Sequence, residues 1–466
     1  MAFLLPHAGP TALARSERFT PNASVHASTY SVSLPVVLNN YDTRIPLFGV
    51  QTYGAIDAST GLSRAVEVGT RWLRVPIAWQ AVEPVSTTPP AYHWEAYDAS
   101  IANARAAGMG LVVTVEAAPS WAATYTNGPI KADALGRFAM FVQALVEHYN
   151  GYGVQGTRGS PVVEYLELYN EPDGDGFVTA NDWQSYWGPF GGEYARMLAA
   201  VYPAVKAASP STQVVLGGVA LDNFEDQGGS FVRSFLDDVF RAGGGAYFDV
   251  LAFHYYPLFA PNWNTYGVGL TGKANYLWQK LAQYGLNKRM ISTEAGWHSN
   301  SDPYPPLNST PEEQARYVIR LNMESMAAQL DVMIWWTLVD PGQGSGANGL
   351  VTQDLSLKPA YTSYRNMTNI LEHARYQRAV TQAESGSSSV EGYVFKSYAG
   401  RTLYVLWYNG TGTQLLDIPG SQVQVTSMMG SATTVNDGDL ADVDHTVNNR
   451  IRLSVGVDPI YVEVIR

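Results

Sequence analysis

The sequence predicts an α/β fold, a (β/α)8 TIM barrel with an appended C-terminal β-sandwich domain. Over residues 45–375, short apolar runs typical of parallel strands buried on both faces alternate with amphipathic helical stretches. The alternation repeats often enough for eight strand–helix units. Over residues 376–466, short β-type runs separated by Gly, Asn and Asp replace the helical patterns. A chain of 466 residues is also too long for one ordinary core.

Each barrel strand is expected as a short run rich in apolar residues. The expected strands begin at Leu47, Trp72, Leu111, Val162, Val214, Phe248, Met290 and Val332. Helices are expected at residues 98–107, 134–149, 192–208, 230–242, 311–329 and 362–375. A doubly wound open sheet is the alternative, but no Gly-rich phosphate loop follows the first strand, so a barrel is favoured.

The two ends of the chain carry a different pattern. Residues 1–44 are rich in Ser, Thr and Pro, and we expect an N-terminal arm whose β-like run, Tyr30–Leu38, could add a strand to the β-sandwich. The strands of that sandwich are expected at residues 392–398, 403–408, 415–418, 423–428 and 460–465. We expect the sandwich to buttress the barrel, because its Tyr and Trp residues fit strand packing.

Composition excludes several classes of function. The net charge of −12, with no basic cluster, argues against nucleic acid or an anionic membrane as partner. The absence of cysteine excludes disulfides, thiolate nucleophiles and Cys-ligated metals. No run approaches the roughly 18 apolar residues of a membrane span. The first six residues are too short for a signal peptide, and we expect an extracellular or secreted protein whose leader is absent from this chain.

Two glutamates dominate the candidate site. Glu171 ends the fourth expected strand and Glu294 the seventh, and the chain then turns through Pro172 or Gly296. A parallel barrel brings the carboxyl ends of its strands to one face. Two facing carboxylates are what cleavage of a glycosidic bond requires. The alternative for each glutamate is a surface acid in a turn or at a helix start.

Further side chains are expected at the same face. Arg74 ends the second strand and needs an anion, for which Glu294 is the natural partner, unless it forms a purely structural ion pair. Asn170 could hydrogen-bond a sugar hydroxyl. His254 and Tyr256 alternate on the sixth strand and therefore face one side. Tyr256 could donate to Glu294, whereas His254 could instead be a core residue.

The remaining candidates are aromatic or acidic residues at other strand ends. Trp336 ends the eighth strand, where its ring could floor a sugar site; Trp335 is the alternative, because the facing parity is uncertain by one residue. Glu116 ends the third strand, and Trp121 follows it in the loop. Either could contact substrate. The 12 Trp and 29 Tyr could supply platforms for pyranose rings or serve packing alone.

Other acids and histidines are given structural roles. Glu164 and Glu167 lie within the fourth strand, and one could pair inside the barrel. His254 and His298 lack the His-x-x-x-His or carboxylate pattern of a metal site, so no metal is expected. There is no Gly-x-Ser-x-Gly elbow of an acyl hydrolase.

Two sequence motifs of this chain resemble those of a known enzyme family. Asn170-Glu171-Pro172 and Thr293-Glu294-Ala295-Gly296 resemble the retaining glycoside hydrolases of clan A, over about residues 45–375. The sequence around Trp336 and the trailing β-sandwich make the chain most like family 39 and its relatives. The resemblance implies double displacement without a cofactor, with Glu171 as acid/base, Glu294 as nucleophile and carboxyl groups about 5–5.5 Å apart.

The resemblance leaves the substrate open. An oligo- or polysaccharide is expected, but not its sugar or linkage, and exo and endo action are equally compatible. The loop 257–269, with Trp263 and Tyr266, could border the cleft. A transglycosylase would use the same residues, and a carbohydrate-binding pseudoenzyme would keep the cleft without turnover. The oligomeric state is unknown from the sequence.

Overall fold

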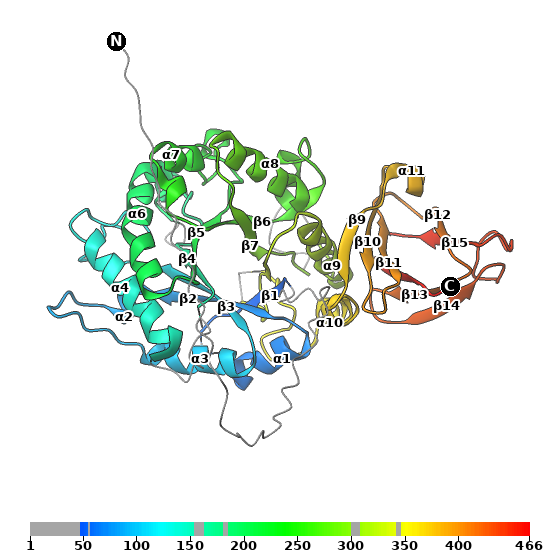
Figure 1. The fold of residues 1–466 in the computed structure, drawn as a ribbon, viewed down its shortest axis with the longest axis horizontal. Coiled ribbons are helices and arrows are strands. Elements are labelled where there is room, and N and C mark those ends of the chain that lie inside the picture. Colours follow the sequence, from blue (N-terminus) through cyan, green and yellow to red (C-terminus); the bar gives the residue numbers. More distant parts are fainter. Residues whose placement is uncertain (1–46, 55, 153–162, 180–184, 300–307, 342–345) are drawn as a thin grey trace, which may run out of the picture. The chain divides into compact units, whose positions relative to one another are not determined.

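Eight parallel strands close into a barrel in the computed structural model, in the order in which they occur in the chain (Figure 1). The structure describes residues 47–54, 56–152, 163–179, 185–299, 308–341 and 346–466. The barrel strands are β1 (Phe48–Gln51), β2 (Trp72–Ala78), β3 (Gly110–Glu116), β4 (Tyr165–Leu168), β5 (Gln213–Val219), β6 (Val250–Tyr255), β7 (Arg289–Ala295) and β8 (Met333–Trp335). The prediction of a TIM barrel is therefore confirmed.

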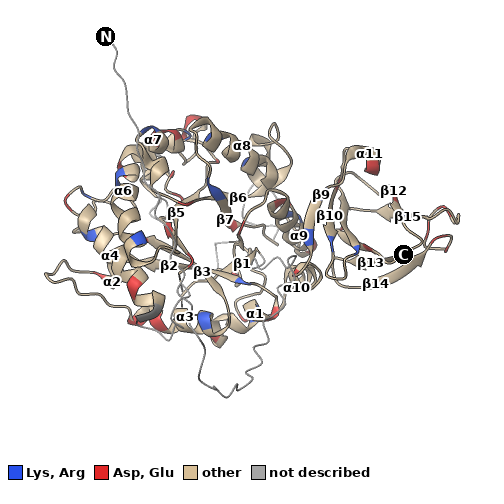
Figure 2. Cartoon of the chain, in the orientation of Figure 1, with Lys and Arg blue, Asp and Glu red and all other residues tan. Residues whose placement is uncertain are grey.

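Helices surround the barrel, as Figure 1 shows. They are α1 (Leu62–Glu67), α2 (Trp79–Val82), α3 (Glu95–Ala106), α4 (Leu135–Glu147), α5 (Gly176–Thr179), α6 (Gly191–Ala208), α7 (Phe235–Arg241), α8 (Gly269–Gln283), α9 (Pro311–Ala327) and α10 (Pro359–Leu371), with α11 (Gln382–Ser385) following. The 3-10 helices are η1 (Ala58–Thr60), η3 (Gly188–Phe190), η4 (Glu225–Gln227), η5 (Gly244–Ala246) and η6 (Pro257–Asn262), and η2 (His148–Tyr152) is a π-helix. Figure 2 shows both acidic and basic residues on the surrounding helices.

Local chemistry explains where helices begin. Thr310 caps α9 by accepting a hydrogen bond from the Glu313 backbone at 3.1 Å, and Pro311 suits the first helical position. By the same rule α10 begins at Pro359, three residues before the predicted start. The helix predicted from residue 230 begins only at Phe235, because the backbone of residues 230 and 231 is hydrogen-bonded to other loops. A helix was expected between the sixth and seventh strands, but the bounds of α8 were not predicted.

The inside of the barrel has an apolar end and a polar end. A buried cluster fills the end where the strands begin, and it includes Trp72, Val112, Tyr165, Val215, Val250, Ile291 and Ile334. Gly110 is required there, because an added Cβ would overlap the Trp72 ring. Nearer the carboxyl ends of the strands, the inward positions are polar. This layering places charged groups at one face of a barrel that is otherwise tightly packed.

Antiparallel sheets follow the barrel. A six-stranded sheet has the order β14-β13-β16-β11-β10-β9, and β12 pairs with β15. Their bounds are β9 (Arg375–Ala379), β10 (Val390–Lys396), β11 (Thr402–Tyr408), β12 (Gln414–Pro419), β13 (Gln422–Ser427), β14 (Ala432–Asn436), β15 (Arg450–Val455) and β16 (Ile460–Val464). The two sheets bury a common apolar cluster that includes Leu406, Leu416, Val423, Ile451 and Val462. This arrangement agrees with the predicted β-sandwich, although β9, β14 and β15 were not predicted.

The six-stranded sheet also packs on the barrel. Phe395 and Trp407 belong to the same buried cluster as the barrel core, and Arg316 on α9 pairs with Asp458 at 2.6 Å. The predicted arm, residues 1–44 with its run Tyr30–Leu38, lies outside the described residues, so the division into arm, barrel and sandwich stays a proposal. Among the helices of the described residues, none is long and apolar enough to cross a membrane.

Candidate active site

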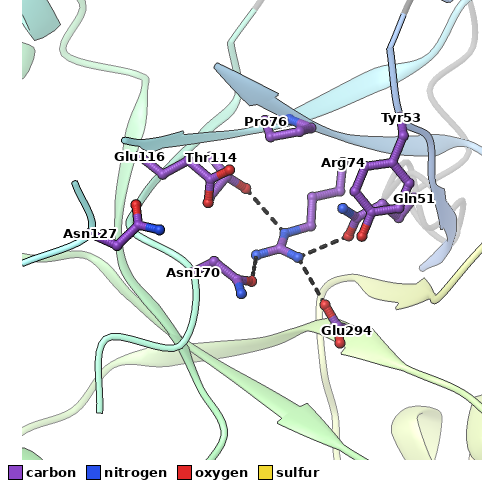
Figure 3. A pocket seen from close by; sticks show the side chains of 9 residues that line it. All are labelled: Gln51, Tyr53, Arg74, Pro76, Thr114, Glu116, Asn127, Asn170 and Glu294. Atoms are coloured by element: carbon purple, nitrogen blue, oxygen red, sulfur yellow. Dashed lines mark hydrogen bonds and ion pairs between the residues drawn. The ribbon is translucent and has the colours of Figure 1, made fainter. Parts of the chain in front are cut away.

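Arg74 organises the polar end of the barrel (Figure 3). Its side chain is almost completely buried at the inward face of β2. The guanidinium lies 2.7 Å from Glu167 and 3.3 Å from Glu294. Its remaining hydrogen bonds go to Gln51, Thr114 and Asn170. The expected contact with Glu294 is present, but the nearer carboxylate is Glu167.

Glu167 has the features of a structural counter-ion. It is fully buried and accepts hydrogen bonds from Thr293 at 2.6 Å, Thr114 at 2.5 Å and the Gly218 backbone at 3.0 Å. Burial opposes its charged form, but the positive charge of Arg74 and the hydrogen bonds from Thr114 and Thr293 together outweigh burial and lower the pKa of Glu167. A buried arginine requires such a permanent anion. Glu167 is thus the fourth-strand acid that pairs inside the barrel.

Glu171 lies in the turn after β4. Its backbone has a left-handed φ of +45°, a conformation that costs on the order of 1–3 kcal/mol for a residue with a side chain. The turn is fixed by Asp173, whose carboxylate accepts hydrogen bonds from the backbone of Ala220 and Leu221. The carboxyl oxygen Oε1 of Glu171 lies 2.9 Å from Nδ1 of His254. Strained backbone of this kind concentrates at functional sites.

The protonation of Glu171 suits a general acid. Burial raises its pKa to about 7, against the opposing positive charges of Arg74 and Lys273. Burial also lowers the pKa of His254 to about 4. The imidazole is therefore neutral near pH 7, while the Glu171 carboxyl is partly protonated at that pH.

Glu294 ends β7 on the opposite side of the polar layer. The Tyr256 hydroxyl donates to Oε1 at 2.5 Å, and Arg74 donates to Oε2 at 3.3 Å. Burial raises the pKa of Glu294, as does the charge of Glu171, whereas His254, Arg74 and the Tyr256 hydrogen bond lower it. Two donors thus hold one carboxylate in a fixed orientation.

The two glutamates face each other. One oxygen of Glu171, one oxygen of Glu294 and one nitrogen of His254 all lie within 4.8 Å of one another. Retaining glycosidases place their carboxyl groups about 5–5.5 Å apart and inverting ones about 6.5–9.5 Å apart, so this close approach favours the retaining geometry. The same atoms could ligate a cation, but Nδ1 of His254 already shares a hydrogen bond with Glu171.

A cavity of about 270 Å³ opens beside these groups (Figure 3). It is lined by Gln51, Tyr53, Arg74, Pro76, Thr114, Glu116, Asn127, Asn170 and Glu294. Gln51, Tyr53, Pro76, Thr114 and Asn127 were not predicted. Gln51 could have been found because it ends the first strand. Asn127 could not, because it lies in a loop beyond the end of β3.

The aromatic candidates separate into two groups. Trp336 donates to the Tyr53 hydroxyl at 2.6 Å and meets the Tyr256 ring edge to face, with ring centroids 6.4 Å apart. Trp335 is fully buried and donates to the Asn348 backbone, so Trp336 is the one at the site. Trp121 does not line the cavity.

The two loop tryptophans differ in burial. Trp121 is half-buried and packs edge to face on the buried Trp79, with ring centroids 5.2 Å apart, so its contact with substrate stays a prediction. Trp263 is buried and donates to Asp222 at 2.9 Å, so its ring does not border the cleft. For Trp263 a tertiary partner, invisible in the local sequence, turns the indole inward.

The chain is similar to one known protein family. A model of the family described as Cellulase (glycosyl hydrolase family 5) matches residues 37–342. No sequence among the curated proteins matches.

Several solved structures share the fold. A family 39 glycoside hydrolase from Bacteroides cellulosilyticus WH2 superposes with a TM-score of 0.68 at 18% identity, covering 90% of this chain and 81% of that one. A GH30 endoxylanase from Clostridium papyrosolvens C71 gives 0.59 at 15% identity, with coverages of 91% and 97%. A GH39 β-xylosidase from Caulobacter crescentus gives 0.56 at 17% identity, with coverages of 90% and 99%. At these identities the likeness shows the fold alone.

Proposed function

Because this chain belongs to the Cellulase family, glycosyl hydrolase family 5, and is a retaining glycosidase of clan A, we propose that Glu171 and Glu294 cleave an oligo- or polysaccharide by double displacement. The observation that carries the assignment is the close approach of the two carboxyl groups, within 4.8 Å. Burial raises the pKa of both carboxyl groups, but their hydrogen-bond partners differ. The pKa of about 7 lets Glu171 carry a proton near neutrality, whereas Arg74 and Tyr256 hydrogen-bond both oxygens of Glu294.

In the first step, an oxygen of Glu294 attacks the anomeric carbon. The bond from that carbon to the leaving oxygen breaks, and Glu171 gives its proton to this oxygen. The products are a glycosyl ester of Glu294 and a free hydroxyl on the departing sugar. Arg74 and Tyr256 orient the nucleophile before attack, so little reorganisation is needed in the transition state.

In the second step, Glu171 acts as a base. Esterification removes the negative charge of Glu294, which lowers the pKa of Glu171 and favours its carboxylate. This carboxylate takes a proton from water, whose oxygen attacks the anomeric carbon and releases Glu294. Two displacements restore the original configuration. Transfer to a sugar hydroxyl instead of water would use the same groups and would appear as longer products.

The cavity suits one sugar unit. Its volume of about 270 Å³ is near the lower end of the roughly 300–1,000 Å³ of ligand pockets. Asn170 and Asn127 offer amide groups to sugar hydroxyls. Glu116 also lines the cavity, and among the described residues none donates a hydrogen bond to its carboxylate or pairs with it. We propose that a sugar hydroxyl donates a hydrogen bond to the Glu116 carboxylate.

Product configuration tests the proposal. The protein would be incubated with aryl glycosides, cellulose, xylan and mannan, and the first product followed by NMR. Retention, together with loss of activity in Glu171→Gln and Glu294→Gln, is the expected result. Initial release of the inverted anomer would remove Glu294 from the role of nucleophile. Binding without cleavage of any substrate would favour a carbohydrate-binding protein.

A further inference from the structure

Three aromatic rings gather on the loops that follow β3 and β4. Tyr125 and Tyr186 stack with ring centroids 4.9 Å apart and planes inclined by 9°. Phe177 meets both edge to face, at 5.2 Å from Tyr125 and 5.4 Å from Tyr186. We call these three residues the aromatic cluster. Because they follow β3 and β4, they belong to the end of the barrel that carries Glu116 and Glu171.

The cluster is exposed and yet firmly built. Phe177 is 53% exposed and Tyr125 38% exposed. An added Cβ at Gly176 would overlap the Tyr186 ring, so the chain packs on that ring as closely as glycine allows. The backbone of Tyr186 also donates to the Asn127 carbonyl at 3.0 Å. Aromatic rings that are exposed and held in place in this way offer a fixed surface on which a ligand can pack.

Asn127 connects the cluster to the cavity. Its side chain lines the cavity (Figure 3), and its Oδ1 accepts a hydrogen bond from Ala117 at 3.0 Å. Its carbonyl holds Tyr186, and Tyr125 lies two positions before it in the chain. A saccharide with one unit beside Asn127 would therefore extend onto the aromatic cluster. The cavity itself is too small for several units, so the rest of a longer substrate must lie on such a rim.

We propose that the aromatic cluster is a second sugar-binding subsite, which takes a pyranose ring of the same chain whose neighbouring unit occupies the cavity. The more exposed ring, Phe177, would pack on the C–H face of the sugar, and Tyr125, whose plane is inclined to it by 86°, would contact the edge of the sugar. The inference rests on the proposed function and deepens it, because it assigns a substrate of several linked units rather than a lone glycoside. Three side chains are far fewer than the roughly 20–30 residues per partner of a protein interface, which favours a sugar as the occupant.

Substrate length provides the test. Phe177→Ala and Tyr125→Ala would be compared with Tyr247→Ala, a matched control that is 37% exposed and precedes β6, at the opposite end of the barrel. Rates would be measured on 4-nitrophenyl glucoside and xyloside and on cello- and xylo-oligosaccharides of increasing length. Affinity electrophoresis in hydroxyethyl cellulose and xylan would report binding without turnover.

The expected result depends on length. The two cluster variants should lose about 5- to 10-fold in kcat/KM on the longer oligosaccharides and run faster in the polysaccharide gels, as expected for one lost ring contact. Their rates on aryl glycosides, and all rates of Tyr247→Ala, should be unchanged.

The outcomes also separate this inference from the proposed function. An equal loss on short and long substrates would show that the cluster is structural, and unchanged rates and gel mobility would overturn the inference; in either case retained aryl hydrolysis would leave the proposed function standing. A wild-type protein that neither binds nor cleaves any polymer or oligosaccharide would also overturn it. Gel retardation that depends on the cluster in a protein without hydrolytic activity would support the subsite and refute the proposed function.

Discussion

Two of the regions in which carboxylates lie buried near an arginine differ in what those carboxylates face. At the mouth of the barrel, Arg74 is hydrogen-bonded to Glu167 and Glu294 beside a cavity. At the junction between α9 and β10, Glu324 and Glu391 lie near Arg320 where barrel and sheet pack together.

The junction acids are enclosed by protein donors. Glu324 accepts from the Leu270 backbone at 2.6 Å, and Glu391 accepts from Tyr393 at 2.6 Å and from Asn409 at 3.1 Å. Among the described residues, Arg320 forms no ion pair with either acid. Its guanidinium instead lies 5.6 Å from the centroid of the Trp407 ring.

Burial raises the pKa of acids in both regions, so a perturbed pKa alone does not identify a catalytic group. The mouth differs because its carboxylates line or adjoin a cavity, at which two of them face each other within 4.8 Å. Geometry and access distinguish a candidate active site from a structural cluster. This distinction makes the junction a source of matched controls.

Removal of the nucleophile should give the largest contrast between the regions. Glu294→Gln keeps shape and hydrogen bonding but cannot attack carbon, so kcat should fall by about 10,000-fold or more. Glu324→Gln makes the same chemical change at the junction and should keep kcat within about twofold. Steady-state kinetics on an aryl glycoside would compare them. Similar losses in both variants would mean that the mouth has no special catalytic status.

The acid/base should show its pKa in the pH profile. Glu171→Gln should lose about 100- to 10,000-fold in kcat on substrates with a sugar leaving group, and less on nitrophenyl glycosides, whose leaving group needs no proton. Because the pKa of Glu171 is raised to about 7, wild-type activity should fall as the pH rises through 7 and the acid loses its proton. This descending limb should be absent in the variant.

A second acid on the same stretch of chain provides the control. Burial also raises the pKa of Glu164 to about 7, but Glu164 precedes β4 and accepts from the Leu111 backbone at 2.9 Å, at the opposite end of the strand. Glu164→Gln should keep the descending limb. Its disappearance in that variant would show that the limb reports stability rather than general acid catalysis.

Strand-end reasoning predicted much of this site, because continuous apolar runs locate strands and a parallel barrel collects their carboxyl ends. Glu171, Glu294, Arg74, Asn170 and Tyr256 were all expected at one face, and the structure brings them together. Their chemical roles stay proposals. The sequence could not show that Glu167 is the nearest partner of Arg74, because the choice between two acids depends on side-chain reach across the barrel.

Other parts of the fold lacked a local signal. The bounds of helix α8 were not predicted; it contains glycines and a lysine, Lys273, that is buried against Asp222 at 2.6 Å and the Ala220 carbonyl. Strand β14 is mostly exposed, so it carries no apolar run. Asn127 and the aromatic cluster lie in loops, where neither strand nor helix periodicity applies. Tertiary contacts determine these features, and a single sequence does not display them.

Replacement of Glu116 should affect substrate binding rather than the chemical step. Unlike the junction acids, it has no hydrogen-bond donor among the described residues, although burial raises its pKa. If a sugar hydroxyl is its partner, Glu116→Ala should raise KM by about 5- to 10-fold with little change in kcat. The melting temperature should stay equal or rise, because an unpaired buried carboxyl is removed. A lower melting temperature with an unchanged KM would contradict this role.

The smallest expected effect concerns stability at the junction. Since burial raises the pKa of Glu324 well above that of an unfolded chain, about 4.3, the folded state holds the proton more tightly. Stability contributed by this proton is therefore lost as the pH rises above about 4.3, toward the raised pKa of the folded state. In Glu324→Gln the amide cannot ionise. Between pH 5 and 8 the melting temperature of this variant should therefore fall less than that of the wild type, by on the order of 1–2 °C.

Glu384 supplies the opposite case in the same sheet region. Hydrogen bonds from Arg378 lower its pKa to about 2, so it is ionised in both folded and unfolded chains above pH 5. Glu384→Gln should shift the whole curve of melting temperature against pH without changing its slope between pH 5 and 8. If the curve of melting temperature against pH for Glu324→Gln were also parallel to that of the wild type, the carboxyl of Glu324 would not titrate between pH 5 and 8. The two buried regions would then differ in protonation as well as in access to a cavity.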